Sequence, residues 1–139
     1  MRRLIVSLIC SALVSLPAAA HQKTQPSGQS EREVKVHIEG KEVDAGELLQ
    51  QLNARGAKKH LKFVETKEGF DYKMKVETVA TGYLGQAGFV GANVVVENNK
   101  GESLFFYRGP GRFTGKRALD AAAQEIIKKL TPYLTGKED

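Results

Sequence analysis

The sequence predicts an α+β domain, a two-layer sandwich of about five mostly antiparallel strands with two helices packed on one face. Apolar and polar residues alternate in several short segments, most regularly from Phe70 to Val79, which is typical of half-buried strands. Two other segments, 44–55 and 115–130, carry Leu, Ile and Ala at helical spacing. The predicted order is strand, helix, four strands, helix. One polar sheet face remains, so both helices should cover the other.

The first strand and the first helix are expected between residues 33 and 56. Apolar residues alternate with polar ones over 33–39, which predicts a strand. Asp44 should begin the helix and cap it, with Glu47 three residues later completing a capping box. Gly56 should end the helix in the left-handed conformation.

Four strands follow. The patterns predict strands at 59–65, 70–79, 92–97 and 103–107, the last two joined by a hairpin turn at 98–101. The strands at 92–97 and 103–107 are apolar throughout, so we expect them at the centre of the sheet.

The final helix has the strongest amphipathic pattern. Thr114 should cap it and Thr131, before Pro132, should end it. Ile126 belongs to its apolar stripe, whereas Asp120 falls on the polar face and is expected to be a solubilising charge.

The amino-terminal segment reads as a secretory signal peptide. Residues 1–20 combine two arginines, a short apolar run and the small residues Ala18–Ala20. The predicted organisation is therefore a signal at 1–20, a flexible leader at 21–32, one domain at 33–134 and a disordered tail at 135–139. The protein is expected to be exported, either periplasmic or secreted, with no transmembrane segment after signal removal.

Charge and cysteine content argue against nucleic-acid binding and against cysteine-dependent sites. Without the two arginines of the signal, 19 basic residues stand against 16 acidic ones, a net charge of +3. Nucleic-acid-binding domains show a larger and more clustered basic excess, so no nucleic-acid partner is expected. The only cysteine, Cys10, lies in the signal behind Ile9, which does not fit a lipid-attachment site. The mature chain thus has no disulfide and no cysteine metal site.

The stretch from Gly109 to Arg117 suggests phosphate binding at first sight. It lacks the Ser or Thr that follows the lysine of a P-loop. Lys116 and Arg117 nevertheless fall in the first turn of a helix and form a candidate anion site; the alternative is a plain strand-to-helix turn. The same stretch resembles the end of a double-stranded-RNA-binding domain, which implies phosphate contacts. Two extra strands and the signal peptide separate this chain from that family.

A histidine becomes the amino terminus if the signal is cleaved after Ala20. An amino-terminal His21 can bind copper through its amine and imidazole, with His37 or His60 as a second ligand. The alternative is an accident of the cleavage site, and no cofactor is expected.

A glycine-spaced segment lies between two predicted strands. Glycines recur at every third position in 81–91, between Tyr83, Leu84 and Phe89. These three side chains are candidate partner contacts because large apolar groups are costly to expose to water. A flexible hairpin connection is the alternative.

The pattern of the whole mature chain resembles small α/β domains of exported envelope proteins. The residues that carry this resemblance are the valine strand at 92–97, the strand with Leu104, Phe105 and Phe106, and the helix beginning at Ala118. The TolB amino-terminal domain, the curli-secretion lipoprotein and the lipoprotein activators of penicillin-binding proteins are of this type. The resemblance implies a non-catalytic accessory or binding domain whose partner is an envelope protein or polymer.

Overall fold

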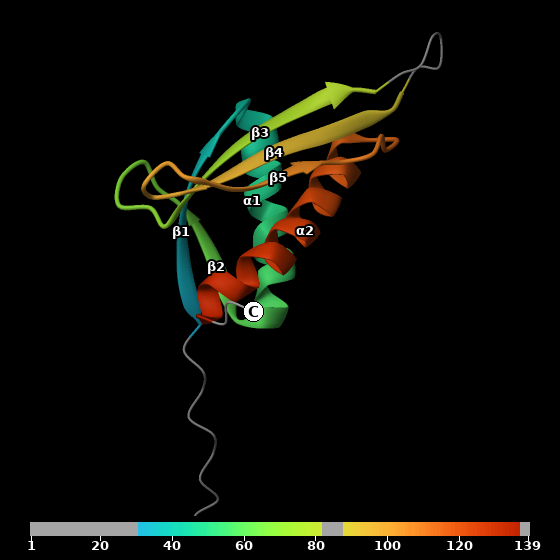
Figure 1. Ribbon diagram of the computed structural model, residues 1–139. Helices are drawn as coiled ribbons and strands as arrows, with labels where there is room; N and C mark the ends of the chain where they lie inside the picture. The colour runs from blue at the N-terminus through green and yellow to red at the C-terminus, as the bar shows by residue number, and fades with distance from the viewer. Residues whose placement is uncertain (1–30, 82–87, 137–139) are drawn as a thin grey trace, which may run out of the picture.

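A computed structural model describes residues 31–81 and 88–136 of the protein. A five-stranded sheet forms one layer and two helices the other (Figure 1). In chain order the elements are β1 (Arg32–Glu39), α1 (Glu42–Gly56), a short 3-10 helix η1 (Ala57–Lys59), β2 (Leu61–Glu65), β3 (Tyr72–Ala80), β4 (Val90–Asn98), β5 (Ser103–Arg108) and α2 (Gly115–Thr135). The predicted α+β class with two helices on one face is confirmed.

The strand order in the sheet is β2-β1-β3-β4-β5. β1 pairs in parallel with β2 on one side and with β3 on the other, whereas β3–β4 and β4–β5 are antiparallel. The expectation that the last two strands are central is therefore wrong for β5, which lies at an edge. Because α1 crosses over the sheet, β2 runs in the same direction as β1 and pairs with it in parallel. β3 then pairs with the other side of β1.

The core lies between the inner face of the sheet and the two helices. β1 contributes Val34 and Val36, both fully buried, which agrees with its interior position. Ile126 is also fully buried, as the pattern of the final helix predicts. The other large side chains that are fully buried or nearly so are Leu48, Leu52, Phe63, Met74, Val94, Val96, Leu119 and Leu130. The alternating and helical patterns thus identify the core correctly.

Helix α1 begins and ends differently from the prediction. It starts at Glu42 after Lys41, and no side chain caps it. Asp44 is instead a buried residue of the first turn, where its carboxylate accepts hydrogen bonds from the Thr78 hydroxyl at 2.7 Å and from the Thr78 backbone N–H at 3.3 Å. It ties the helix to β3. At the other end Gly56 is right-handed (φ −66°), because the chain continues into η1 and turns only at His60 (φ 55°).

Helix α2 continues past its predicted end. Pro132 lies inside the helix, which ends at Thr135 before the left-handed Gly136. A proline removes one backbone N–H, here the one that would donate to the Lys128 carbonyl. In the same turn the Thr131 hydroxyl donates to the neighbouring Ile127 carbonyl at 2.6 Å. The extra turn buries Leu134, which is 7% exposed, and this burial favours helix beyond the proline.

The hairpin between β3 and β4 extends into the glycine-spaced segment. β3 reaches Ala80, β4 begins at Val90, and the Thr81 N–H donates to the Phe89 carbonyl at 2.8 Å. Val90 and Gly91 thus belong to β4, and one further hydrogen bond joins the two sides beyond the end of β3, which the prediction of a loop over 81–91 missed.

Candidate functional site

An aromatic pair lies where the β3–β4 hairpin meets the start of α2. The rings of Phe89 and Phe113 pack with their centroids 5.0 Å apart, and Phe113 is 72% exposed. We call these two residues the aromatic end. Phe89 comes from the glycine-spaced segment and Phe113 from the glycine-rich turn before α2. The fold therefore brings together two segments that the sequence singled out separately.

Backbone hydrogen bonds hold the aromatic end in place. Val90 and Arg112 exchange two N–H to carbonyl bonds, of 2.7 and 2.8 Å. A Cβ at Gly111 would lie 2.3 Å from the Thr81 hydroxyl oxygen and 3.0 Å from the Phe89 Cβ. Only glycine lets these chains approach so closely, which gives the glycine of this turn a structural role.

Cationic side chains lie next to the aromatic end in the sequence and at the start of α2. Arg112, Lys116 and Arg117 are exposed. The Arg117 N–H donates to the Thr114 hydroxyl at 3.3 Å, so the predicted cap is confirmed. Lys116 Nζ lies 3.6 Å from a Glu47 carboxylate oxygen.

The predicted anion site at Lys116 and Arg117 borders a hollow of about 350 Å³. Gln51, Thr114 and Asp120 complete its lining. With Glu47 beside Lys116 and Asp120 in the wall, carboxylates compete with an anion for these cations. The anion site stays a prediction.

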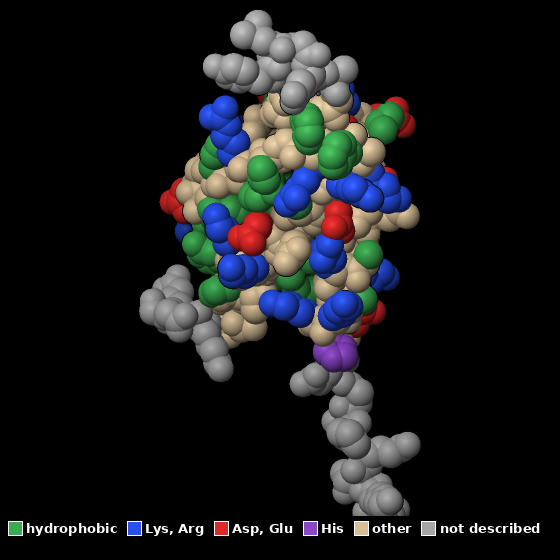
Figure 2. Space-filling model, turned by 90° about the vertical axis from the view of Figure 1, so that its right-hand side faces the viewer, with side chains coloured by type: hydrophobic (Ala, Val, Ile, Leu, Met, Phe, Trp, Pro, Cys, Tyr) green, Lys and Arg blue, Asp and Glu red, His purple; other side chains and the backbone are tan. Residues whose placement is uncertain are grey.

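A second hollow, of about 250 Å³, lies further along the seam between the two helices. Its lining is Arg55, Lys58, Lys59, Gln124, Ile127 and Lys128, which we call the basic seam. Figure 2, which views the molecule from the right of Figure 1, shows Lys and Arg side chains gathered on that side with few carboxylates among them. Sequence reasoning missed this site, because its residues lie about 70 positions apart and only the packing of α1 against α2 joins them.

One ion pair separates the two hollows. The Arg55 guanidinium donates to both carboxylate oxygens of Asp120, through Nε at 2.8 Å and through Nη2. The prediction that Asp120 is a plain solubilising charge is therefore wrong. Asp120 lies on the side of α2 that faces α1, which the pattern of α2 alone does not reveal.

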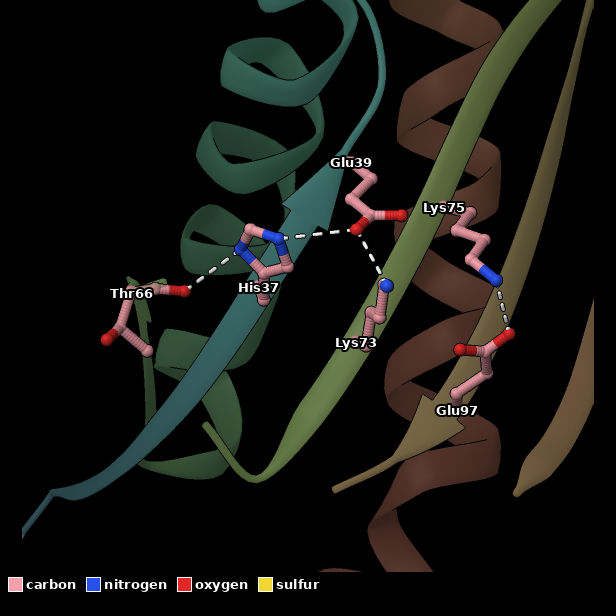
Figure 3. A network of polar contacts seen from close by, with 6 residues as sticks. All are labelled: His37, Glu39, Thr66, Lys73, Lys75 and Glu97. Atoms are coloured by element: carbon pink, nitrogen blue, oxygen red, sulfur yellow. Dashed lines mark hydrogen bonds and ion pairs between the residues drawn. The ribbon is translucent and has the colours of Figure 1, made fainter. Parts of the chain in front are cut away.

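The outer face of the sheet carries a network of charges (Figure 3). Glu39 on β1 accepts from Lys73 Nζ at 2.7 Å, and His37 Nε2 lies 3.5 Å from the same carboxylate oxygen. On β3 and β4, Lys75 and Glu97 pair at 2.7 Å. Exposed pairs of this kind contribute little to stability. The network fits the solvated polar face that strand alternation predicts.

The pKa values of this network follow from its hydrogen bonds. The Lys73 hydrogen bond holds the pKa of Glu39 below its ordinary value, and the Glu97 hydrogen bond raises the pKa of Lys75. A lowered carboxyl pKa stabilises the fold above the unfolded-state pKa, and this contribution is lost as the pH falls through the folded-state value.

We expect Lys73→Met to raise the pKa of Glu39 towards the ordinary glutamate value of about 4.3, because the Lys73 hydrogen bond is the largest cause of the shift. NMR titration of the Glu39 carboxyl carbon measures this directly. Lys62→Met, which removes an exposed charge on β2, should leave the Glu39 pKa in place. Equal Glu39 pKa values in the two variants would contradict the assignment.

The two described histidines, His37 and His60, do not come together. The Nδ1 of His37 is 3.2 Å from the Thr66 carbonyl oxygen, and its ring stacks on Phe70. His60 lies beside Arg32, since its carbonyl accepts from the Arg32 N–H. Arg32 is five residues before His37 on β1, which is roughly 16 Å along the strand. His21 lies outside the described residues, and within 31–81 and 88–136 no group of three His, Cys, Asp or Glu side chains is arranged to hold a metal ion.

Two of the three predicted partner contacts, Tyr83 and Leu84, also lie outside the described residues. Phe89 is half-buried beneath Phe113. Sequence reasoning missed Phe113, although a large aromatic residue between two cations in a glycine-rich turn was an available signal. Neither described helix is long and apolar enough to span a membrane.

The chain was compared with known proteins. No family model matches it, and no curated protein matches it. Among solved structures, a minor lipoprotein from Acinetobacter baumannii is similar, with 12% identity over 75% of this chain and 95% of the other and a TM-score of 0.48. A PelC dodecamer from Paraburkholderia phytofirmans has 10% identity over 73% and 86%, with a TM-score of 0.42. Uncharacterized lipoprotein B from Nitrosomonas europaea has 14% identity over 79% and 91%, with a TM-score of 0.40. These likenesses concern the arrangement of the chain, and no ligand or partner follows from them.

Proposed function

We propose that the protein is an exported, non-catalytic binding domain of the bacterial cell envelope and that it contacts a protein partner through the aromatic end. The signal-peptide pattern of residues 1–20 supports export. The pattern-level resemblance to TolB-type, curli-secretion and penicillin-binding-protein-activator domains supports an accessory role. The chain also lacks the sequence motifs of the common hydrolases, which favours binding over catalysis.

The observation that carries this proposal is the exposure of Phe113. Its ring is 72% exposed although it packs against the Phe89 ring, so part of this aromatic pair is open to water. Aromatic side chains that are held in place lose little conformational entropy on binding and are enriched at the centres of protein interfaces. The hydrogen bonds between Val90 and Arg112 hold this pair in place before any partner arrives.

The surroundings of the aromatic end define the chemistry of the partner. Arg112, Lys116 and Arg117 are exposed beside it. Their charges favour a partner with a negative surface and disfavour a positive one. The complementary surface is therefore an apolar side chain bordered by carboxylates. Tyr83 and Leu84, which precede Phe89 in the same segment, stay predicted partner contacts.

The test is to replace Phe113 by alanine and to recover partners by crosslinking in the envelope. We expect recovery to fall at least tenfold, because truncating a central aromatic residue of an interface costs about 2 kcal/mol or more. The thermal midpoint should hardly move, since this side chain is mostly exposed.

Phe106→Ala is the matched control. Phe106 is an aromatic residue that is 52% exposed on the outer sheet face, beside a hollow lined by Lys75, Val95 and others. Partner recovery should persist in this variant. The opposite result, loss with Phe106→Ala and retention with Phe113→Ala, would place the binding surface on the outer face of the sheet and refute the proposal.

A further inference from the structure

We propose that the basic seam binds the phosphate headgroups of anionic phospholipids, so that the domain rests with this end against a membrane surface. The proposal is independent of the aromatic end. It depends on the charge of the seam, on the position of the seam in the fold and on the kind of cation that it contains.

The seam has an excess of positive charge that its own residues do not neutralise. Of its four cations, Arg55 is paired with Asp120. Lys59 donates to the neutral hydroxyl of Thr131 at 3.1 Å. Among the described residues, Lys58 and Lys128 form no ion pair. Three lysines therefore surround one hollow without a carboxylate of their own, and a bound anion would relieve their mutual repulsion.

Helix-dipole effects explain only part of this cluster. Arg55 lies in the last turn of α1 and Lys58 and Lys59 follow it in η1, at a helix end where cations interact favourably with the last carbonyl groups. Lys128 does not belong to that end. It lies seven residues before the end of α2 and lines the same hollow. Its position favours a ligand that several cations share over a purely local role.

The seam lies at the end of the fold where the amino-terminal segment joins the domain. The first residue of β1, Arg32, donates its N–H to the His60 carbonyl at 2.9 Å, and its guanidinium donates to the Leu134 carbonyl. Figure 1 shows the start of β1, the end of α1 and the end of α2 together at the bottom of the view. The predicted signal peptide, which meets the membrane during export, precedes this same end.

The opposite end remains available for another partner. Thr114, next to Phe113, lies fourteen residues before Lys128 on α2. This is roughly 20 Å of helix, measured along its axis. A membrane bound at the seam would therefore leave the aromatic end directed away from the lipid.

The side chains of the seam suit a headgroup layer. Lysine binds phosphate as a mobile point charge, without the fixed two-point geometry of arginine, so several headgroups in different positions can satisfy it. The apolar stems of the lysines and the floor at Ile127 can remain in contact with less polar surface while the ammonium groups reach the phosphates. Free phosphate offers the same charge in one small ion, and the experiment has to separate the two sources.

The test is co-sedimentation of the purified protein with two kinds of vesicle at low salt. One kind is phosphatidylcholine alone, and the other adds roughly one third phosphatidylglycerol, so that only the second carries a net negative surface. We expect binding to the anionic vesicles only, weakening steeply between low and physiological salt. Replacing Lys58, Lys59 and Lys128 together by glutamine should weaken it by roughly a hundredfold, as three lysines near an anionic surface account for about that factor.

The control variant replaces Lys41, Lys67 and Lys100 by glutamine, which changes the net charge equally at exposed positions away from the seam. It should keep most of the vesicle binding. Equal losses in the two triple variants, with both folded by circular dichroism, would mean that net charge alone acts and would overturn the proposal.

Titration with inorganic phosphate, monitored through the amide NMR shifts of the seam residues, distinguishes binding of free phosphate from binding of lipid headgroups. Saturation by free phosphate at low concentration together with no preference for anionic vesicles would overturn the membrane assignment. Retained vesicle binding in the seam variant with loss of a crosslinked protein would overturn it as well, in favour of an acidic protein partner.

Discussion

Replacing Ile126 by alanine is expected to destabilise the protein by about 2–5 kcal/mol. Ile126 is fully buried on the stripe of α2 that also includes Leu119, Ala122 and Leu130. Its truncation removes apolar contacts and leaves a cavity between helix and sheet. Domains of this size have a total stability of only about 5–15 kcal/mol, so the loss is a large fraction. Urea unfolding measures it as a lower midpoint with an unchanged slope.

Gln124→Ala is the appropriate control on the same helix. Gln124 is exposed, and its truncation should change stability by no more than about 0.5 kcal/mol. Asp120 is less suitable, since it pairs with Arg55. Similar urea midpoints for I126A and Q124A would mean that Ile126 does not lie on the buried stripe of α2.

Two glycines of α1 should respond in opposite directions to the same substitution. A Cβ at Gly56 would lie 2.8 Å from Phe63 Cε2 and 3.0 Å from the Leu61 carbonyl oxygen. Phe63 is 2% exposed and has no room to move away, and the carbonyl belongs to β2. Gly56→Ala is therefore expected to cost about 1–3 kcal/mol through overpacking.

At Gly46 a Cβ would meet nothing within 4 Å, and the residue is exposed within the helix. Gly46→Ala should stabilise the protein by about 0.5–1 kcal/mol, because alanine loses less backbone entropy in a helix. Thermal midpoints of the two variants measure the pair. A fall in both would show that α1 tolerates no added methyl group, and a rise in both would show that α1 does not approach β2 as closely as described.

Several predictions that needed only local pattern were correct. The alternation in β3 and the helical repeat in α2 identified buried residues such as Met74 and Ile126. Each helix or strand buries one face and exposes the other. The spacing of its apolar residues therefore shows which side chains are buried, wherever the element lies in the fold. The Thr114 cap was also predictable, because the capping hydrogen bond reaches only three residues along the chain.

Local signals failed where a distant segment competed for the same residue. Asp44 has the sequence context of a helix cap, yet Thr78 on β3 offers two donors to its carboxylate. Gly56 has the context of a helix stop, yet its lack of a Cβ is needed for contact with β2. In both cases the residue type correctly indicated a specific structural role. The contact that defines this role is made by a segment too far along the chain to be inferred.

By itself, the sequence determined the class of the fold, the number of its strands and α-helices and the large residues of its core. It also marked Phe89, Lys116 and Arg117 as unusual. The tertiary structure alone decided the strand order with β1 between β2 and β3, the packing of Phe113 against Phe89 and the gathering of lysines at the basic seam. The reason is physical: burial periodicity is a property of one element, whereas strand order, ion pairs and surface clusters depend on which elements come to lie side by side.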